Sequence, residues 1–280
     1  MDSRRPSRNQ PRYSVPKDLI PPLNRDLEDS RLSVKQLENA ILPKPGCKLL
    51  KEFPPITHPV IAELLDKHGS FKCDREKDKP SDKASSMADY FSVSANYKYV
   101  ENLSLLKTSI SPFQSVNGSS HSRLKFGPVQ LENGDVYEGE WLDGKKDGWG
   151  KLLSATGFVY EGFWKADVAY GKGRIINING DMYEGDWVNG KYHGKGTFTG
   201  ANGYKYIGEW SHDMQHGLGK EFWPDGSSYE GEYKWSKKHG KGTFRWANGE
   251  KYVGEFVLNN MHGNGVYEWP NGQKYKGTWR

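Results

Sequence analysis

The sequence predicts an all-β repeat array: an elongated single-layer antiparallel sheet of 23-residue β-hairpins, preceded by an extended, proline-rich and partly helical N-terminal region. Two observations support this. Glycines recur in a fixed register, and no insertion or deletion breaks that register. A pentapeptide Tyr-x-Gly-x-aromatic recurs with its leading tyrosines always 23 residues apart, at Tyr137, Tyr160, Tyr183, Tyr206, Tyr229, Tyr252 and Tyr275. A constant period of this size indicates a repeat array.

Each pentapeptide alternates apolar and charged residues, as a half-buried strand does. In Tyr137–Trp141 the two rings and Gly139 share one face, and Glu138 and Glu140 point to the other. We therefore expect the aromatic residues to form the core, and the glycine to leave a slot for a side chain of a neighbouring repeat. The expected core consists of Tyr137, Trp141, Tyr160, Trp164, Tyr183, Trp187, Tyr206, Trp210, Tyr229, Tyr233, Tyr252, Phe256, Tyr275 and Trp279.

A second series of glycines marks the expected turns. Most of them follow Asn or Asp, and Asn-Gly or Asp-Gly between apolar runs predicts a type I′ turn with positive φ at both central residues. A Gly-x-Gly element, as in Gly194-Lys195-Gly196, also recurs, and the second strand of each repeat is expected to follow it. The expected turn glycines are Gly134, Gly157, Gly180, Gly203, Gly226, Gly249 and Gly272.

The combined pattern, Tyr-x-Gly-x-Trp followed by His-Gly-x-Gly-x-Phe and Asn/Asp-Gly, resembles the MORN (membrane occupation and recognition nexus) repeat. The resemblance covers residues 131–280, as six full repeats and a partial seventh. It implies an elongated hairpin sheet that assembles or tethers proteins, as in the radial spoke heads of cilia, and it implies no reaction. The chain departs from the pattern at Asp147 and Tyr170, which replace the histidine, and at Glu221, where an apolar residue is usual. We expect a bulge or a shifted register at Glu221.

Residues 1–130 are expected to form an extended arm with short helices and linkers, ahead of a repeat domain at residues 131–280. Helices are expected at residues 33–42 and at Pro59–His68, the second capped by Thr57 and followed by Gly69. Residues 72–86 are expected to be a mobile charged linker, and residues 87–106 stay open between helix and strand. Because neither helix is long enough to fold alone, both should dock on the sheet or on partners.

The positive net charge of +5 is an N-terminal property. Residues 131–280 hold 19 basic and 20 acidic residues, so the first 130 residues hold 21 and 15. A groove for nucleic acid needs a basic track, so the nearly neutral array argues against nucleic-acid binding. The possible anchor for an anionic membrane or for acidic protein tails consists of Arg4, Arg5, Arg8, Arg12 and Lys17.

The chemistry-bearing residues of the repeats favour a structural role. No helix follows the Gly-x-Gly elements, so they lack the helix N-terminus of a phosphate-binding loop. Side chains one hairpin apart lie about 10 Å from each other, too far to share a metal ion. This distance argues against a row of metal sites formed by His193, His216, His239 and His262. A solvated polar face is expected for Glu138, Glu161, Glu184 and Glu230. We therefore expect no enzyme activity, no cofactor and no metal.

Cysteine content and hydropathy indicate the compartment. Cys47 and Cys73 match no zinc or redox spacing, and a protein without disulfides fits a reducing environment. No apolar run is long enough for a transmembrane helix, and no apolar segment marks a secretory signal. We expect a cytoplasmic, cytoskeletal protein.

The interpretation we favour is a non-catalytic scaffold or interaction subunit of a large assembly, in the axoneme of a cilium or flagellum and similar to a radial spoke. The alternative is a peripheral membrane tether that binds anionic phospholipids through basic residues. The seventh repeat stops after its first strand, at Arg280. Because unpaired edges invite pairing, we expect a partner or self-association at this edge, unless the natural chain continues.

Overall fold

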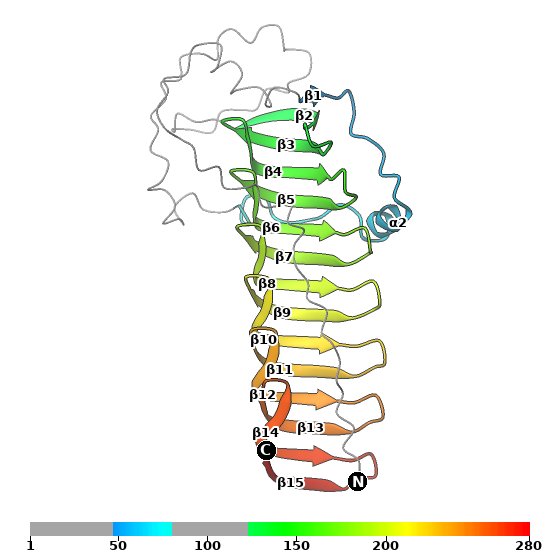
Figure 1. Cartoon of the computed structure of the whole chain (residues 1–280), viewed down its shortest axis with the longest axis vertical. Coiled ribbons are helices and arrows are strands. Elements are labelled where there is room, and N and C mark those ends of the chain that lie inside the picture. Colours follow the sequence, from blue (N-terminus) through cyan, green and yellow to red (C-terminus); the bar gives the residue numbers. More distant parts are fainter. Residues whose placement is uncertain (1–46, 80–122) are drawn as a thin grey trace, which may run out of the picture.

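The computed structural model describes residues 47–79 and 123–280. Fifteen strands form one sheet, in which each strand pairs antiparallel with the next one along the chain. Figure 1 shows this ladder, with tight turns along one long edge and longer loops along the other. The elements are β1 (Lys48–Leu49), α2 (Pro59–His68), β2 (Leu124–Gln130), β3 (Val136–Leu142), β4 (Lys145–Leu153), β5 (Val159–Lys165), β6 (Val168–Ile176), β7 (Met182–Val188), β8 (Lys191–Thr199), β9 (Lys205–Ser211), β10 (Met214–Phe222), β11 (Ser228–Lys234), β12 (Lys237–Arg245), β13 (Lys251–Val257), β14 (Asn260–Glu268) and β15 (Lys274–Trp279).

The predicted fold class is confirmed: the repeats form one open antiparallel sheet of consecutive hairpins. The sheet begins earlier than the boundary expected at residue 131, because β2 pairs with β3 and β1 pairs with β2. Of the two helices expected in the N-terminal region, the one at residues 33–42 lies outside the described residues, as does the ambiguous segment at residues 87–106.

Helix α2 has the bounds that the sequence predicts, but its start differs from the prediction. His58 is the residue at the N-cap, and it makes no side-chain capping bond, so the assignment of Thr57 as the cap was wrong. Pro59 begins the helix, where its missing N–H leaves no donor unsatisfied. Gly69 ends the helix with φ of 66°, and its N–H donates to the carbonyl of Leu65 at 2.7 Å.

The turns at the two ends of each hairpin are of different kinds. Within a repeat, two residues with positive φ join the strands, as Asp143 (51°) and Gly144 (72°) do between β3 and β4. Between repeats, a five-residue loop contains the Asn-Gly pair, and only the glycine has positive φ there, as at Gly134 (86°). The side-chain oxygen of Asn133 instead accepts the N–H of Asp135 at 3.1 Å. The assignment of type I′ turns to the Asn-Gly pairs was therefore wrong, since these turns lie at the opposite ends of the hairpins.

All of the expected turn glycines have positive φ, from Gly134 to Gly272. The Gly-x-Gly elements lie inside the second strand of each repeat rather than before it. The first glycine of each Gly-x-Gly element has positive φ, as at Gly171 (78°). It lies where the strand register shifts, which marks a bulge. The second glycine, Gly173, lies opposite Gly162 of the neighbouring strand.

The tyrosine of each repeat lies over this pair of glycines. The ring of Tyr160 covers Gly162 and Gly173, and its hydroxyl donates to the carbonyl of Phe163 at 3.0 Å. The slot beside the glycine is thus filled by the tyrosine of the same repeat, and not by a neighbouring repeat as we had expected. Burial raises the pKa of Tyr160 well above the usual value of 10, so this hydroxyl stays a neutral donor.

Aromatic rings of successive repeats then form a continuous ladder. Trp187 packs edge-on against Tyr160 of the preceding repeat, with 5.2 Å between ring centroids, and its Nε1 donates to the carbonyl of Gly173 at 3.0 Å. The expected core residues from Tyr137 to Phe256 are all buried. Tyr275 differs from the expectation, because β15 is the last strand of the sheet and leaves this ring 46% exposed. Trp279 is partly buried.

We predict that Gly173→Ala destabilises the array by about 1–3 kcal/mol, the usual cost of overpacking a tight core. A Cβ at this position would coincide with the hydroxyl of Tyr160 and approach its Cζ to 2.6 Å. Urea unfolding of the purified chain measures the change. Gly127→Ala is the matched control, since a Cβ there meets no atom within 4 Å. Equal stability of the two variants would contradict the proposed packing.

Candidate interaction surface

The face of the sheet opposite the tyrosine rings is here called the second face. Other described residues of the chain cover its half from β2 to β7, and its half from β8 to β15, here called the open half, is free of them. Residues 47–79, here called the strap, extend the sheet beside β2 and then lie against the second face as far as β7. In Figure 1 the helix of the strap lies beside the edge formed by β5 to β7. The strap begins as a short edge strand, where β1 pairs with β2 and the N–H of Leu50 donates to the carbonyl of Pro128 at 2.8 Å.

Helix α2 has an apolar seat on the second face. Ile61 is fully buried against Val159 and Ile176, and Leu64 and Leu65 pack around this contact. In later repeats the position of Val159 carries a polar residue, Lys205, Ser228 or Lys251. The apolar seat is therefore specific to the early repeats, which explains why α2 docks there.

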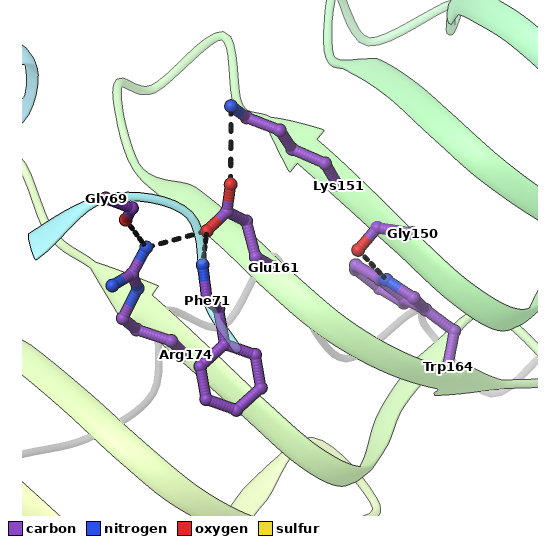
Figure 2. A network of polar contacts seen from close by, with 7 residues as sticks. All are labelled: Gly69, Phe71, Gly150, Lys151, Glu161, Trp164 and Arg174. Carbon is purple, nitrogen blue, oxygen red and sulfur yellow. Dashed lines mark hydrogen bonds and ion pairs between the residues drawn. The ribbon is translucent and has the colours of Figure 1, made fainter. Parts of the chain in front are cut away.

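A buried ion pair fixes the end of the strap (Figure 2). Glu161 accepts hydrogen bonds from Arg174 Nη2 at 2.7 Å and from the N–H of Phe71 at 2.9 Å. Arg174 also donates to the carbonyl of Gly69, and Lys151 Nζ lies 3.4 Å from Glu161. Two strands of the array thus hold two backbone groups of the strap through charge-assisted bonds, which are the stronger kind.

The burial of Glu161 corrects the expected solvated row of glutamates. Its side chain is only 8% exposed, because the strap covers it. Glu184 and Glu230, which occupy the same position in later repeats, are exposed as expected, and Glu138 is partly exposed. Sequence reasoning missed the difference because Glu161 lies between Tyr and Gly, as Glu138, Glu184 and Glu230 do. The one available signal was the unusual Phe163 at the charged position of that repeat.

The last described part of the strap also packs on the sheet. The ring of Phe71 stacks on Trp149 with 5.8 Å between centroids, and the guanidinium of Arg75 lies 4.5 Å from the Trp149 ring. Residues 72–79, which begin the expected mobile linker, therefore contact the array. Burial and the nearby Asp78 carboxylate raise the pKa of the Cys73 thiol to about 11, which keeps this thiol protonated and unreactive at neutral pH.

A second row of carboxylates closes the bulges of the hairpins. Asp186 accepts the N–H of Lys195 at 2.9 Å, and Glu232 accepts the N–H of Lys241 at 2.9 Å. These acidic residues are at the fourth position of the pentapeptide, and we had not assigned them a role. The pattern that could have revealed it is an acidic residue that faces a Gly-x-Gly in the paired strand.

The four recurring histidines lie beside these bulges. The ring of His193 packs edge-on against His212, with 5.3 Å between centroids, and burial together with His212 lowers the pKa of His193. Within residues 47–79 and 123–280, no three His, Cys, Asp or Glu side chains gather as a metal site would require.

A buried polar cluster occupies the tyrosine face at the fourth and fifth repeats. Glu221 is fully buried and accepts hydrogen bonds from Tyr204 at 2.6 Å and Tyr233 at 2.9 Å. Lys238 Nζ forms an ion pair with Glu221 at 2.7 Å and lies 4.7 Å from the centroid of the Trp223 ring. The strand register at Glu221 equals that of the other hairpins, so the expected bulge or register shift there was wrong. The hairpin keeps its register because the charge has partners.

The remaining expected site residues are the basic anchor at Arg4, Arg5, Arg8, Arg12 and Lys17, which lies outside the described residues. In the part of the chain that the structure describes, no helix is long and apolar enough to cross a membrane.

The repeats match a known family. Six segments match the MORN repeat, at residues 137–159, 160–182, 183–203, 206–228, 229–251 and 252–274. The chain contains six consecutive MORN repeats. MORN repeats indicate a protein-interaction or membrane-associated repeat protein, and no catalytic family is indicated. No curated protein sequence matches the chain.

Several solved structures are distantly similar. The TCP domain of SAS-4 (dCPAP) of Drosophila melanogaster, in complex with a proline-rich motif of Ana2 (dSTIL), is 14% identical with a TM-score of 0.35, over 60% of this chain and 99% of that one. The G-box domain of the microcephaly protein CPAP is 10% identical with a TM-score of 0.36, over 57% and 87%. The TCP10 domain of Danio rerio CPAP is 11% identical with a TM-score of 0.29, over 57% and 73%.

We predict that Glu161→Ala loosens the strap. The substitution leaves the buried Arg174 without its carboxylate and removes the acceptor of the Phe71 N–H, and breaking a buried pair costs about 3–5 kcal/mol. Hydrogen exchange at residues 69–71 and limited proteolysis within the strap measure the loss of protection. Glu184→Ala is the matched control, because this carboxylate is exposed one repeat further along. Unchanged protection in Glu161→Ala would show that the ion pair does not hold the strap.

We predict strong coupling between Glu221 and Lys238. Glu221→Leu alone leaves Lys238 buried and unpaired, and should destabilise the chain by about 3–5 kcal/mol. Adding Lys238→Met should recover more than half of this loss, because a buried pair can be replaced by apolar residues at little cost. Urea unfolding of both single variants and the double variant gives the coupling energy. Additive losses would contradict a direct interaction.

Proposed function

We propose that the protein is a non-catalytic scaffold or interaction subunit of a large assembly in the axoneme of a cilium or flagellum, within a complex of the radial-spoke type. One observation carries this proposal: a long sheet presents an unbroken second face, of which the described residues 47–79 cover only the half nearest β1. In repeat arrays each unit contacts its neighbours alone, so the sheet can serve as a spacer with an extended contact surface.

The choice of the axoneme rests on the MORN repeats and on charge. The repeats of this chain resemble the MORN arrays of radial spoke heads. The nearly neutral charge of residues 131–280 favours protein partners over an anionic surface. By analogy with those repeats, we infer a cytoplasmic, cytoskeletal location for the protein.

The alternative function is a peripheral membrane tether. The observation that favours it is the excess of basic residues in the first 130 residues, which includes the anchor set between Arg4 and Lys17. Each basic residue near an anionic membrane adds about 1 kcal/mol, so a cluster of this size supports binding that weakens as salt is added.

The decisive experiment is proximity labelling by the full chain in ciliated cells, followed by mass spectrometry. We expect axonemal proteins to be enriched over a cytosolic control carrying the same label. Enrichment of lipid kinases or membrane-contact proteins in their place would contradict the axonemal scaffold and favour the tether.

A vesicle experiment separates the two functions in vitro. The tether requires flotation of the full chain with phosphatidylserine vesicles, lost at high salt and in a variant with the five anchor residues changed to Gln. The scaffold predicts no difference between that variant and the unchanged chain, with phosphatidylcholine vesicles as the control.

A further inference from the structure

Two hairpin tips of the open half carry large apolar residues in a backbone conformation that rarely holds them. The first residue of each two-residue turn has φ close to 50°. We call these residues the tip row, which consists of Asp143, Ala166, Asn189, His212, Trp235 and Leu258. The earlier members are small or are Asp, Asn and His, types that tolerate this region better than most residues. Trp235 (52°) and Leu258 (51°) are the exceptions, and both belong to the open half.

These two side chains are also exposed. Trp235 is 51% exposed and Leu258 is 57% exposed, so neither ring nor methyl groups bury enough surface to account for their placement. Backbone strain of about 1–3 kcal/mol at an exposed residue indicates a use beyond folding. Asn or Asp would suit both turns better, as the rest of the tip row shows within the same chain.

The ring of Trp235 lies back over the sheet. Its centroid is 4.7 Å from that of His216, which pairs directly across the strands with Glu209 on the second face. A side chain that inserts into a bilayer would point away from the protein. The ring instead packs against His216, which favours a protein partner over a membrane.

More exposed apolar residues continue from the strap towards these tips. Ile207 and Leu218 line a hollow of about 460 Å³ whose other wall is formed by Phe71 at the end of the strap. Val253 and Val257 are exposed further along, next to the Leu258 tip. The open half therefore continues the interface that the strap has already formed on the same face.

The spacing of the tips identifies the form of the partner. Successive tips are two strands apart, or about 9.6 Å. Residues seven apart on an α-helix are about 10.5 Å apart and lie on one side, so a helix along the array can contact each tip in turn. An extended strand alternates its faces and cannot do this. A polyproline helix has a similar repeat, but it docks between aromatic rings, and the tip row offers one such ring.

We propose that the open half, centred on Trp235 and Leu258, binds an amphipathic α-helix of a partner protein, laid along the array with apolar residues seven positions apart. The proposal rests on the scaffold function and names the chemistry of its partner. The same face already accepts a helix at α2, where Ile61 is buried. The large exposed side chains would then be the main anchors, as Trp often is at interfaces.

The test begins with a photo-crosslinking amino acid at Lys237 of the full chain in ciliated cells. Lys145, the equivalent position of the first repeat, is the control site. We expect Lys237 to capture a segment of another protein with apolar residues every seven positions. Capture of lipid, of a proline-rich segment, of this chain itself, or of nothing above the Lys145 control would overturn the proposal.

The captured segment, made as a synthetic peptide, is then titrated against the purified full chain. Trp235→Asn with Leu258→Asn should weaken its binding at least about tenfold, as the loss of anchor residues does. The same double variant should keep or raise the Tm, because Asn suits the turns better. Ile178→Asn is the control, an exposed apolar residue in a five-residue loop. Unchanged peptide affinity in the double variant would overturn the proposal.

Proximity labelling by this double variant separates the inference from the scaffold function. Loss of some axonemal partners by the double variant supports both the scaffold function and the helix-binding inference. If every axonemal partner is retained, the inference fails while the scaffold stands. If the unchanged chain labels no axonemal protein, the scaffold proposal fails.

Discussion

The whole array depends on a tyrosine ring lying flat over two glycines that face each other across a strand pair. The ring can approach the backbone only because neither glycine has a Cβ, and the hydroxyl then reaches a carbonyl in its own strand, as Tyr160 does with Phe163. The aromatic residue of the next repeat closes over the ring from the side. Thus a single-layer sheet, which has no second layer to bury its side chains, obtains a dry core within the thickness of one ring.

The second face carries what is individual to this chain. The tyrosine face repeats with little change, whereas the position of Val159 on the second face is apolar in the early repeats and polar at Lys205 and Lys251. The strap contacts this apolar part through Ile61, Leu64 and Leu65. On the tyrosine face, the buried Glu221 and Lys238 are a similar local exception. Glu221 forms an ion pair with Lys238 and accepts hydrogen bonds from two tyrosine hydroxyls.

Periodicity made the fold predictable, because a fixed register places every Tyr, Trp and Gly in equivalent surroundings. Helix α2 was equally visible, from Pro59 at its start and Gly69 at its end. Contacts between segments far apart in the chain could not be predicted from the sequence. Glu161 and Glu184 both lie between Tyr and Gly, and the contact with the strap makes the first a buried ion-pair partner while the second stays solvated. The prediction of the turn types was wrong for a local reason, because an Asn-Gly pair fits a five-residue loop as well as a two-residue turn.

The strap breaks the one-dimensional character of the array. Each hairpin is built from residues close in sequence, which favours rapid folding, while the strap makes contacts such as Phe71 to Glu161 and Gly69 to Arg174 across 90 and 105 residues. Its docking requires β4, β5 and β6 to be in place, so it belongs to a late step of folding. A chain emerging from the ribosome presents the strap before its binding site exists. The apolar side of α2 therefore remains without its contact site until the second repeat, residues 160–182, has been synthesised.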